Sequence, residues 1–139
     1  MNIRTFKPAD TVQVVELWHA CELTRPWNNP ELDIQRKVKV NDELFLVGES
    51  NGKIIASVMG SYDGHRGWMY YLAVSPDQQQ RGYATQLIRY LEEKLMAMGC
   101  PKINFQIRTD NIAVQEFYKK LGFGVDDAVS MGKRLIPDN

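Results

Sequence analysis

The sequence predicts a single domain of the α/β (α+β) class, a mixed, mostly antiparallel and twisted sheet of six to seven strands flanked by about four helices. Three observations favour this class. The 139 residues suffice for one domain of ordinary size and are too few for two. A composition of 44% hydrophobic and 24% charged residues is typical of a globular domain with its own core. Strand-like and helix-like segments alternate along the chain without a linker or a repeat.

The first half of the chain places two helices between strands. The expected elements, in chain order, are a strand over residues 1–6, helices over 8–21 and 31–40, and strands over 44–49 and 53–62. Prolines and asparagines in residues 22–30 end the first helix in an irregular surface loop. Asn51 and Gly52 between the last two strands are the strongest short-range signal for a hairpin, which predicts an antiparallel pair.

The second half continues with elements that alternate between strand and helix. They are a strand over residues 68–74, a helix over 82–98, a strand over 102–109, a helix over 111–121 and a tail, 124–136, that returns to the sheet. Apolar residues from Ala84 to Leu95 recur at helical spacing, and Gly99 followed by Pro101 ends that helix. Apolar and polar side chains then alternate, as in a strand with one buried face. The predicted order is β-α-α-β-β-β-α-β-α-β-β.

Charge and composition exclude several classes of function. Seventeen Lys and Arg balance 17 Asp and Glu, so no net field favours nucleic acid or a membrane, and we expect neither as a partner. Charged residues such as Arg4 and Asp10 interrupt the first apolar stretch, which argues against a signal peptide and favours a cytoplasmic protein. The two cysteines are expected to be reduced thiols. With two histidines and no paired Cys motif, no metal site is predicted.

A polar turn between an apolar strand and a helix carries the clearest chemical signal. The first amides of a helix lack intrahelical acceptors and lie at the positive end of its dipole, so the turn suits a diphosphate. Gly82 lets an anion approach the backbone, and Arg81 adds a positive charge. The common P-loop and dinucleotide motifs are absent, and a plain turn with solvated side chains is the alternative. The residues predicted to bind the anion are Gln79, Gln80, Arg81, Gly82, Tyr83 and Ala84.

Two motifs, in order along the chain, resemble those of the GCN5-related N-acetyltransferase (GNAT) superfamily. The first is Gln-x-x-Gly-x-Ala over residues 79–84, which matches the acyl-CoA diphosphate loop. The second is Asn-x-x-Val-x-x-Phe-Tyr-Lys-Lys-Leu-Gly-Phe over residues 111–123, which matches the penultimate helix. The resemblance covers nearly the whole chain. A narrower similarity to one bacterial acetyltransferase is carried by residues 25–28, 64–67 and 132–136.

The resemblance implies that acetyl-CoA is the co-substrate and that it lies between the strands over residues 68–74 and 102–109, which splay apart in the family. Leu72 and Val74 match the positions whose backbone pairs with the pantetheine arm. A primary amine would attack the thioester directly, and backbone N–H groups would stabilise the oxyanion. Tyr118 would protonate the departing thiolate, and Asn111 would hold the cofactor arm or a water. From its position on an apolar stripe, Tyr118 can equally be a core tyrosine.

One position departs from the pattern of related N-terminal acetyltransferases. Five residues before Asn111 they carry a glutamate, where this chain has Gln106, which cannot accept a proton as a carboxylate does. The usual general base is therefore missing. Either another group acts through water, with His65, Glu49 and Asp63 as weak candidates, or the amine arrives already neutral.

Acceptor specificity is expected in two loops, residues 22–30 and 62–68, which flank the acceptor end of the groove in the family. The leading hypothesis is an N-acetyltransferase, monomeric or homodimeric, that acts on a small amine, an amino acid or a peptide or protein amine. The alternative is a non-catalytic acyl-CoA sensor, which Gln106 favours and Tyr118 opposes. An RNA-binding or protein-interaction module finds little support in the zero net charge. The candidate acceptor residues are Trp27, Asn28, Tyr62, Asp63 and His65.

Overall fold

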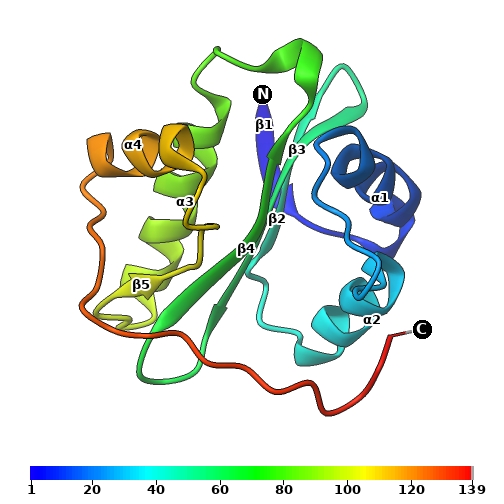
Figure 1. Ribbon diagram of the computed structural model, residues 1–139. Helices are drawn as coiled ribbons and strands as arrows, with labels where there is room; N and C mark the ends of the chain where they lie inside the picture. Colours follow the sequence, from blue (N-terminus) through cyan, green and yellow to red (C-terminus); the bar gives the residue numbers. More distant parts are fainter. Residues whose placement is uncertain (139) are drawn as a thin grey trace.

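The computed structural model describes residues 1–138, which fold into four α-helices around a five-stranded sheet of order β1-β2-β3-β4-β5 (Figure 1). In chain order the elements are β1 (Asn2–Thr5), the 3₁₀ turn η1 (Pro8–Asp10), α1 (Thr11–Ala20), α2 (Pro30–Val40), β2 (Phe45–Ser50), β3 (Lys53–Tyr62), β4 (Gly67–Val74), the 3₁₀ turn η2 (Pro76–Gln78), α3 (Tyr83–Ala97), β5 (Ile103–Asn104) and α4 (Ile112–Lys120). The predicted α/β class and single layer of sheet between helices are confirmed.

Helices cover both faces of the sheet, α1 and α2 on one and α3 and α4 on the other (Figure 1). Each face has its own apolar core because alternate side chains of a strand point to opposite faces. Trp18 and Phe45 are buried in the core on the α1 side. Leu87 and Leu91 are buried in the core on the α3 side. The central strands β2, β3 and β4 therefore separate two clusters, and α3 presents its apolar stripe to one of them.

The pairing between the last two strands, β4 and β5, is very short. β1 to β4 pair antiparallel, whereas β5 runs parallel to β4. The pair has only two registered positions, Gly67 with Ile103 and Trp68 with Asn104. Beyond Trp68, β4 continues to Val74 with no registered partner on that side among the described residues. The structure thus shows the splayed strand pair that the family resemblance implies.

A β-bulge lies in the open half of β4. The register shifts by one residue between Ser57 and Met59 of β3, so that Tyr71 and Leu72 together oppose Val58. Tyr71 has φ of 53°, in the left-handed region that a bulky side chain seldom adopts. The bulge therefore has a strained residue that its surroundings must hold in place.

The prediction of six to seven strands is wrong, and the fifth strand is shorter than expected. The sequence favours a strand over residues 102–109, yet only Ile103–Asn104 is one. The alternating pattern of this segment is real, since Phe105 and Ile107 pack against the core on the α3 side. A strand also needs a backbone partner, and β4 turns away from the segment after Trp68.

The predicted return of the tail to the sheet is also wrong. Residues 124–138 contribute no strand and run across the surface towards α2 (Figure 1). The tail approaches β5 through side chains, since the Asn104 Nδ2 donates to Asp126 at 2.8 Å. Its far end is fixed to the other face, where the Asp138 carboxylate accepts the backbone N–H of Asn29 at 2.9 Å and pairs with Arg36 at 2.9 Å. The tail is thus held by side-chain contacts and not by backbone pairing with the sheet. Within the described residues, α4 is therefore the last regular element.

Candidate active site

The polar turn before α3 exposes backbone amides, as the sequence predicts. Gln80 and Gly82 both have positive φ, 65° and 80°, which bends the chain sharply into the helix. The first bond of the helix runs from the Gln86 N–H to the Gly82 carbonyl at 3.0 Å. Within residues 1–138 the amides of residues 83–85 have no backbone acceptor. No atom lies within 4 Å of where a Gly82 β-carbon would stand, so this turn, residues 79–84, leaves room for an anion.

The side chain of Gln79 braces the end of β4. Its Nε2 donates to the Val74 carbonyl at 3.1 Å, and the Cys21 Sγ donates to the same oxygen at 3.2 Å. Both lone pairs of that carbonyl are therefore used inside the protein. Of the residues predicted to bind the anion, Gln79 thus has its side chain engaged within the protein, whereas the Arg81 side chain is exposed.

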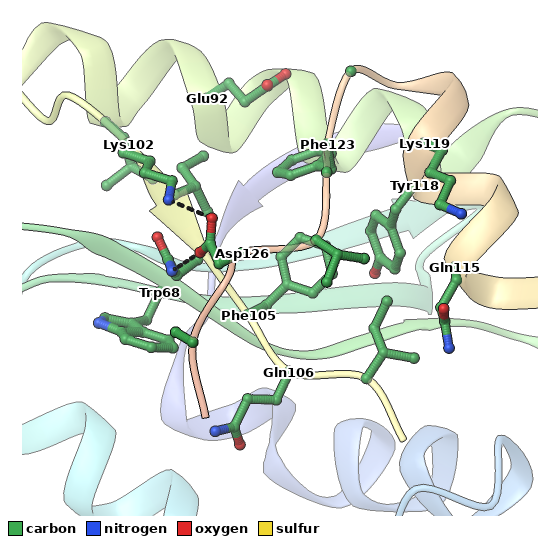
Figure 2. A pocket seen from close by; sticks show the side chains of 18 of the residues that line it. Trp68, Glu92, Lys102, Phe105, Gln106, Gln115, Tyr118, Lys119, Phe123 and Asp126 are labelled. Atoms are coloured by element: carbon green, nitrogen blue, oxygen red, sulfur yellow. Dashed lines mark hydrogen bonds and ion pairs between the residues drawn. The ribbon is translucent and has the colours of Figure 1, made fainter. Parts of the chain in front are cut away.

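Tyr118 lies in the wall of a groove of about 1340 Å³ between the second half of α3, residues 102–109 and the start of the tail. Figure 2 shows its ring beside Phe105 and Phe123. The ring centroids of Tyr118 and Phe105 are 4.3 Å apart, and those of Tyr118 and Phe123 are 5.7 Å apart. Tyr118 is a buried member of the core on the α3 side, against which the partly buried side chains of Leu72 and Tyr83 also pack. The predicted acid therefore shares a core with a residue of the open edge of β4.

Burial also changes the acidity of Tyr118. Its hydroxyl has no hydrogen-bond partner within residues 1–138, and desolvation raises its pKa from 10.0 to about 12. The group is therefore a protonated phenol throughout the neutral range, as a proton donor must be.

Because the pKa of Tyr118 is raised, the free energy of unfolding is expected to fall as the pH rises through the alkaline range. The unfolded chain releases the Tyr118 proton near pH 10 and the folded chain near pH 12, so unfolding becomes easier between these values. We expect the free energy of unfolding to lose about 2–3 kcal/mol from this residue over that interval and nothing below it. Urea denaturation at pH 9 and pH 11.5 measures the loss, which should be smaller in Tyr118→Phe. An equal loss in both proteins would contradict the assignment.

Asn111 and Gln106 occupy structural positions in the unliganded fold. The Asn111 side chain is the N-cap of α4, because its Oδ1 accepts the Val114 N–H at 3.3 Å. Gln106 is exposed and donates to the Ser130 hydroxyl of the tail. Figure 2 shows its side chain pointing away from Tyr118. Neither side chain provides a base next to the predicted acid.

The candidate acceptor residues fall into two separate places. In the turn between β3 and β4, Asp63 Oδ1 accepts the backbone N–H groups of His65 and Arg66, both at 2.8 Å, which holds its pKa below the usual range. The Tyr62 hydroxyl contacts the carbonyl of Gly99, so this turn lies beside the C-terminal end of α3, about 22 Å along the helix from the anion turn.

The other two candidates lie in the loop between α1 and α2. Trp27 is 51% exposed, and the Asn28 Oδ1 accepts from Arg134 of the tail at 2.9 Å. The structure therefore places Tyr118 in the same core as Leu72 of the β4 edge, but the two groups of acceptor candidates lie on different loops.

A cluster around Tyr71 was not expected from the sequence. Its ring stacks on Trp18 with centroids 3.7 Å apart and planes 9° apart, and its hydroxyl donates to Asp33 Oδ2 at 2.6 Å. Burial and the negative charge of Asp33 raise the pKa of Tyr71. The only signal in the sequence is the pair Tyr70-Tyr71, which breaks the alternation of β4 where the bulge lies.

Residues 1–138 carry neither a membrane-spanning helix nor a cluster of metal ligands. No helix among residues 1–138 is both long and apolar enough to cross a bilayer. The same residues include no group of three or more His, Cys, Asp or Glu side chains placed to hold a metal ion.

The sheet opens between the parallel strands β4 and β5, and free backbone amides lie at the start of α3. This arrangement is the one expected for the acyltransferase family that the sequence motifs resemble. The sequence profile of the Acetyltransferase (GNAT) family matches residues 12–123. The chain belongs to this family of acetyltransferases.

Relatives and solved structures agree with this assignment. Acetyltransferases of Yersinia pestis and Pectobacterium atrosepticum are each 54% identical to this chain over 138 residues, which cover 99% of this chain and 98% of each relative. Ard1 from Thermoplasma volcanium has a TM-score of 0.77 at 25% identity, over 90% of this chain and 83% of that one. An aminoglycoside antibiotic 6'-N-acetyltransferase from Acinetobacter haemolyticus has a TM-score of 0.75 at 21% identity, over 98% of this chain and 99% of that one. This last likeness is one of fold.

Proposed function

We propose that the protein is an acetyl-CoA-dependent N-acetyltransferase that moves the acetyl group to a primary amine by direct attack. The observation that supports this most is the open edge of β4, which has the anion turn at one end and Tyr118 in the adjoining core. The amides of residues 83–85 and the charge of Arg81 would hold the diphosphate. Backbone groups at Leu72 and the N–H of Val74 would face the extended arm as an added strand does, whereas the Val74 carbonyl already accepts from Gln79 and Cys21.

In the transfer step a C–N bond forms to the acceptor and the C–S bond of the thioester breaks. The chain supplies two groups for this step. A backbone N–H on the β4 edge stabilises the oxyanion, and Tyr118 gives its proton to the departing sulfur. The attacking nitrogen loses one proton to water as the amide forms, and water returns a proton to Tyr118. The pKa of Tyr118, about 12, lies above that of a free thiol. An apolar site raises the pKa of a thiol as well, so the transfer in place is closer to balance than the reference values imply.

The residues near the site favour an acceptor that loses its proton easily. Gln106 has no carboxylate, Asp63 is bound within its turn, and Glu49 is paired with Arg4 at 2.8 Å. An α-amino group has a pKa of about 7.7–8.0, against about 10.4 for a lysine side chain, and is partly neutral in water at pH 7–8. The lower value holds for the α-amine of a peptide, whereas the α-amine of a free amino acid lies beside its own carboxylate and keeps its proton more tightly. We therefore propose the α-amine of a peptide ahead of a lysine side chain.

The test is a pair of measurements on the purified protein. Titration calorimetry with acetyl-CoA should show binding, and release of free thiol should follow when α-amines are added. A matched panel of amino acids, peptides and Nα-blocked lysine compounds separates the two kinds of amine. Absence of binding would overturn the proposal.

A second candidate function is a non-catalytic acyl-CoA sensor, which the missing carboxylate at position 106 favours. The same experiment separates the two functions. Tight binding of acetyl-CoA without thiol release from any amine of the panel supports the sensor.

A further inference from the structure

The peptide bond between Tyr71 and Leu72 is held by a chain of buried hydrogen bonds. The Ser57 hydroxyl donates to the Tyr71 carbonyl at 2.9 Å. The Trp18 Nε1 donates to the same Ser57 hydroxyl at 2.9 Å. Ser57 and Trp18 are both fully buried, at 0% exposure.

This chain fixes the direction of the Ser57 proton. A serine hydroxyl has one proton to donate and two lone pairs to accept with. Because the Trp18 indole can only donate, it occupies a lone pair and leaves the Ser57 proton to the Tyr71 carbonyl. Stacking of the Trp18 ring on Tyr71, with centroids 3.7 Å apart, holds the same residue from its side-chain end.

The direction of the carbonyl determines the direction of the next amide. In a trans peptide the C=O of one residue and the N–H of the next point in opposite directions, and the structure has no cis peptide among its described residues. The Tyr71 carbonyl points to Ser57 on β3. The Leu72 N–H therefore points away from β3, towards the edge that β5 has left open.

We propose that Ser57 is a positioning residue for acetyl transfer, which orients the Tyr71–Leu72 peptide so that the Leu72 N–H faces the thioester oxygen. This inference rests on the proposed function. The bulge alone does not fix this peptide, because Tyr71 is strained at φ of 53° and relaxes once its carbonyl is released. Ser57 acts through the backbone and does not touch the substrate.

The first test measures the NMR signal of the Leu72 backbone amide in ¹⁵N-labelled protein. Acetyl-CoA has the thioester carbonyl that CoA lacks, so the two ligands should shift the Leu72 signal differently in the wild type. In Ser57→Ala this difference should be lost, although both nucleotides still bind. Val47→Ala is the matched control, because Val47 is equally buried in the same core on the neighbouring strand β2. Its ligand-dependent difference at Leu72 should remain.

The second test separates positioning from stability by kinetics. We expect kcat to fall about 10²-fold in Ser57→Ala, as for loss of one oxyanion donor, with the KM for acetyl-CoA unchanged. Ser57→Cys is slightly larger but keeps the shape and a weak S–H donor, so its kcat should lie between that of the wild type and that of Ser57→Ala. Trp18→Phe keeps the stacked ring but frees the Ser57 hydroxyl to rotate, and it should lose less activity than Ser57→Ala.

The outcomes distinguish the two proposals. Wild-type kcat in Ser57→Ala, or an unchanged ligand-dependent difference at Leu72, would overturn the role of Ser57 while leaving the proposed function standing. An equal loss of kcat in Val47→Ala would also overturn it, because the effect would then be general destabilisation. Absence of nucleotide binding by the wild type would remove the proposed function itself.

Discussion

Replacing Tyr118 with phenylalanine is expected to lower kcat by about 10²–10⁴-fold, the usual contribution of a general acid. The free energy of unfolding should stay close to the wild-type value. The Tyr118 hydroxyl has no hydrogen-bond partner within residues 1–138, so its removal breaks no internal bond. The ring keeps its contacts with Phe105 and Phe123. Thiol release under saturating acetyl-CoA measures the first effect, and urea denaturation at pH 7 measures the second.

Tyr90→Phe is the control for this variant. Tyr90 lies on the exposed side of α3, 36% exposed and outside the proposed site, and its hydroxyl group should be dispensable. Activity in Tyr118→Phe that equals that of the control would assign Tyr118 to the core and remove it from the mechanism.

Replacing Gly82 with valine should weaken acetyl-CoA binding by about 10²-fold or more. Gly82 has φ of 80°, and a β-branched residue there relaxes to negative φ. The relaxation moves the amides at the start of α3 away from the diphosphate, and each charge-assisted hydrogen bond is worth about 1.5–3 kcal/mol. The dissociation constant from titration calorimetry is the measurement.

Gly99→Val is a closely matched control at the other end of the same helix. Gly99 has φ of 85°, and, as at Gly82, nothing lies within 4 Å of the added β-carbon. The two variants should lose similar free energy of unfolding, since the backbone strain is alike. If Gly99→Val weakens acetyl-CoA binding as much as Gly82→Val does, the turn before α3 is not the diphosphate site.

Local signals in the sequence are enough to predict most of the elements. The predicted helix over residues 31–40 begins at Pro30 in the structure, with Asn29 as its N-cap. The predicted hairpin turns at Asn51 and Gly52, both with positive φ. Each of these features depends on residues that are neighbours in the sequence, and the same holds for the anion turn.

The features that the sequence does not reveal depend on contacts between distant segments. The left-handed Tyr71 is held by Ser57 and Trp18, which are 14 and 53 residues away. The tail ends on Asn29, 109 residues away, and contacts β5 only through side chains, so among the described residues β5 has β4 as its single backbone partner. No local pattern encodes such pairs, so neither the bulge nor the short fifth strand could be predicted. Tyr118 can be proposed from the sequence because the motif that contains it is contiguous.

The stacking of Trp18 on Tyr71 gives the molecule an optical reporter of its own. The Trp18 indole is wholly shielded from water, whereas Trp27 is half exposed and Trp68 is partly exposed. In a Trp68→Phe variant, an aqueous collisional quencher such as iodide therefore suppresses Trp27 emission and spares Trp18. A movement of the strained Tyr71 should then change the Trp18 emission that remains in the presence of the quencher. Occupancy of the open strand edge can therefore be followed in solution without a label and without knowing the acceptor.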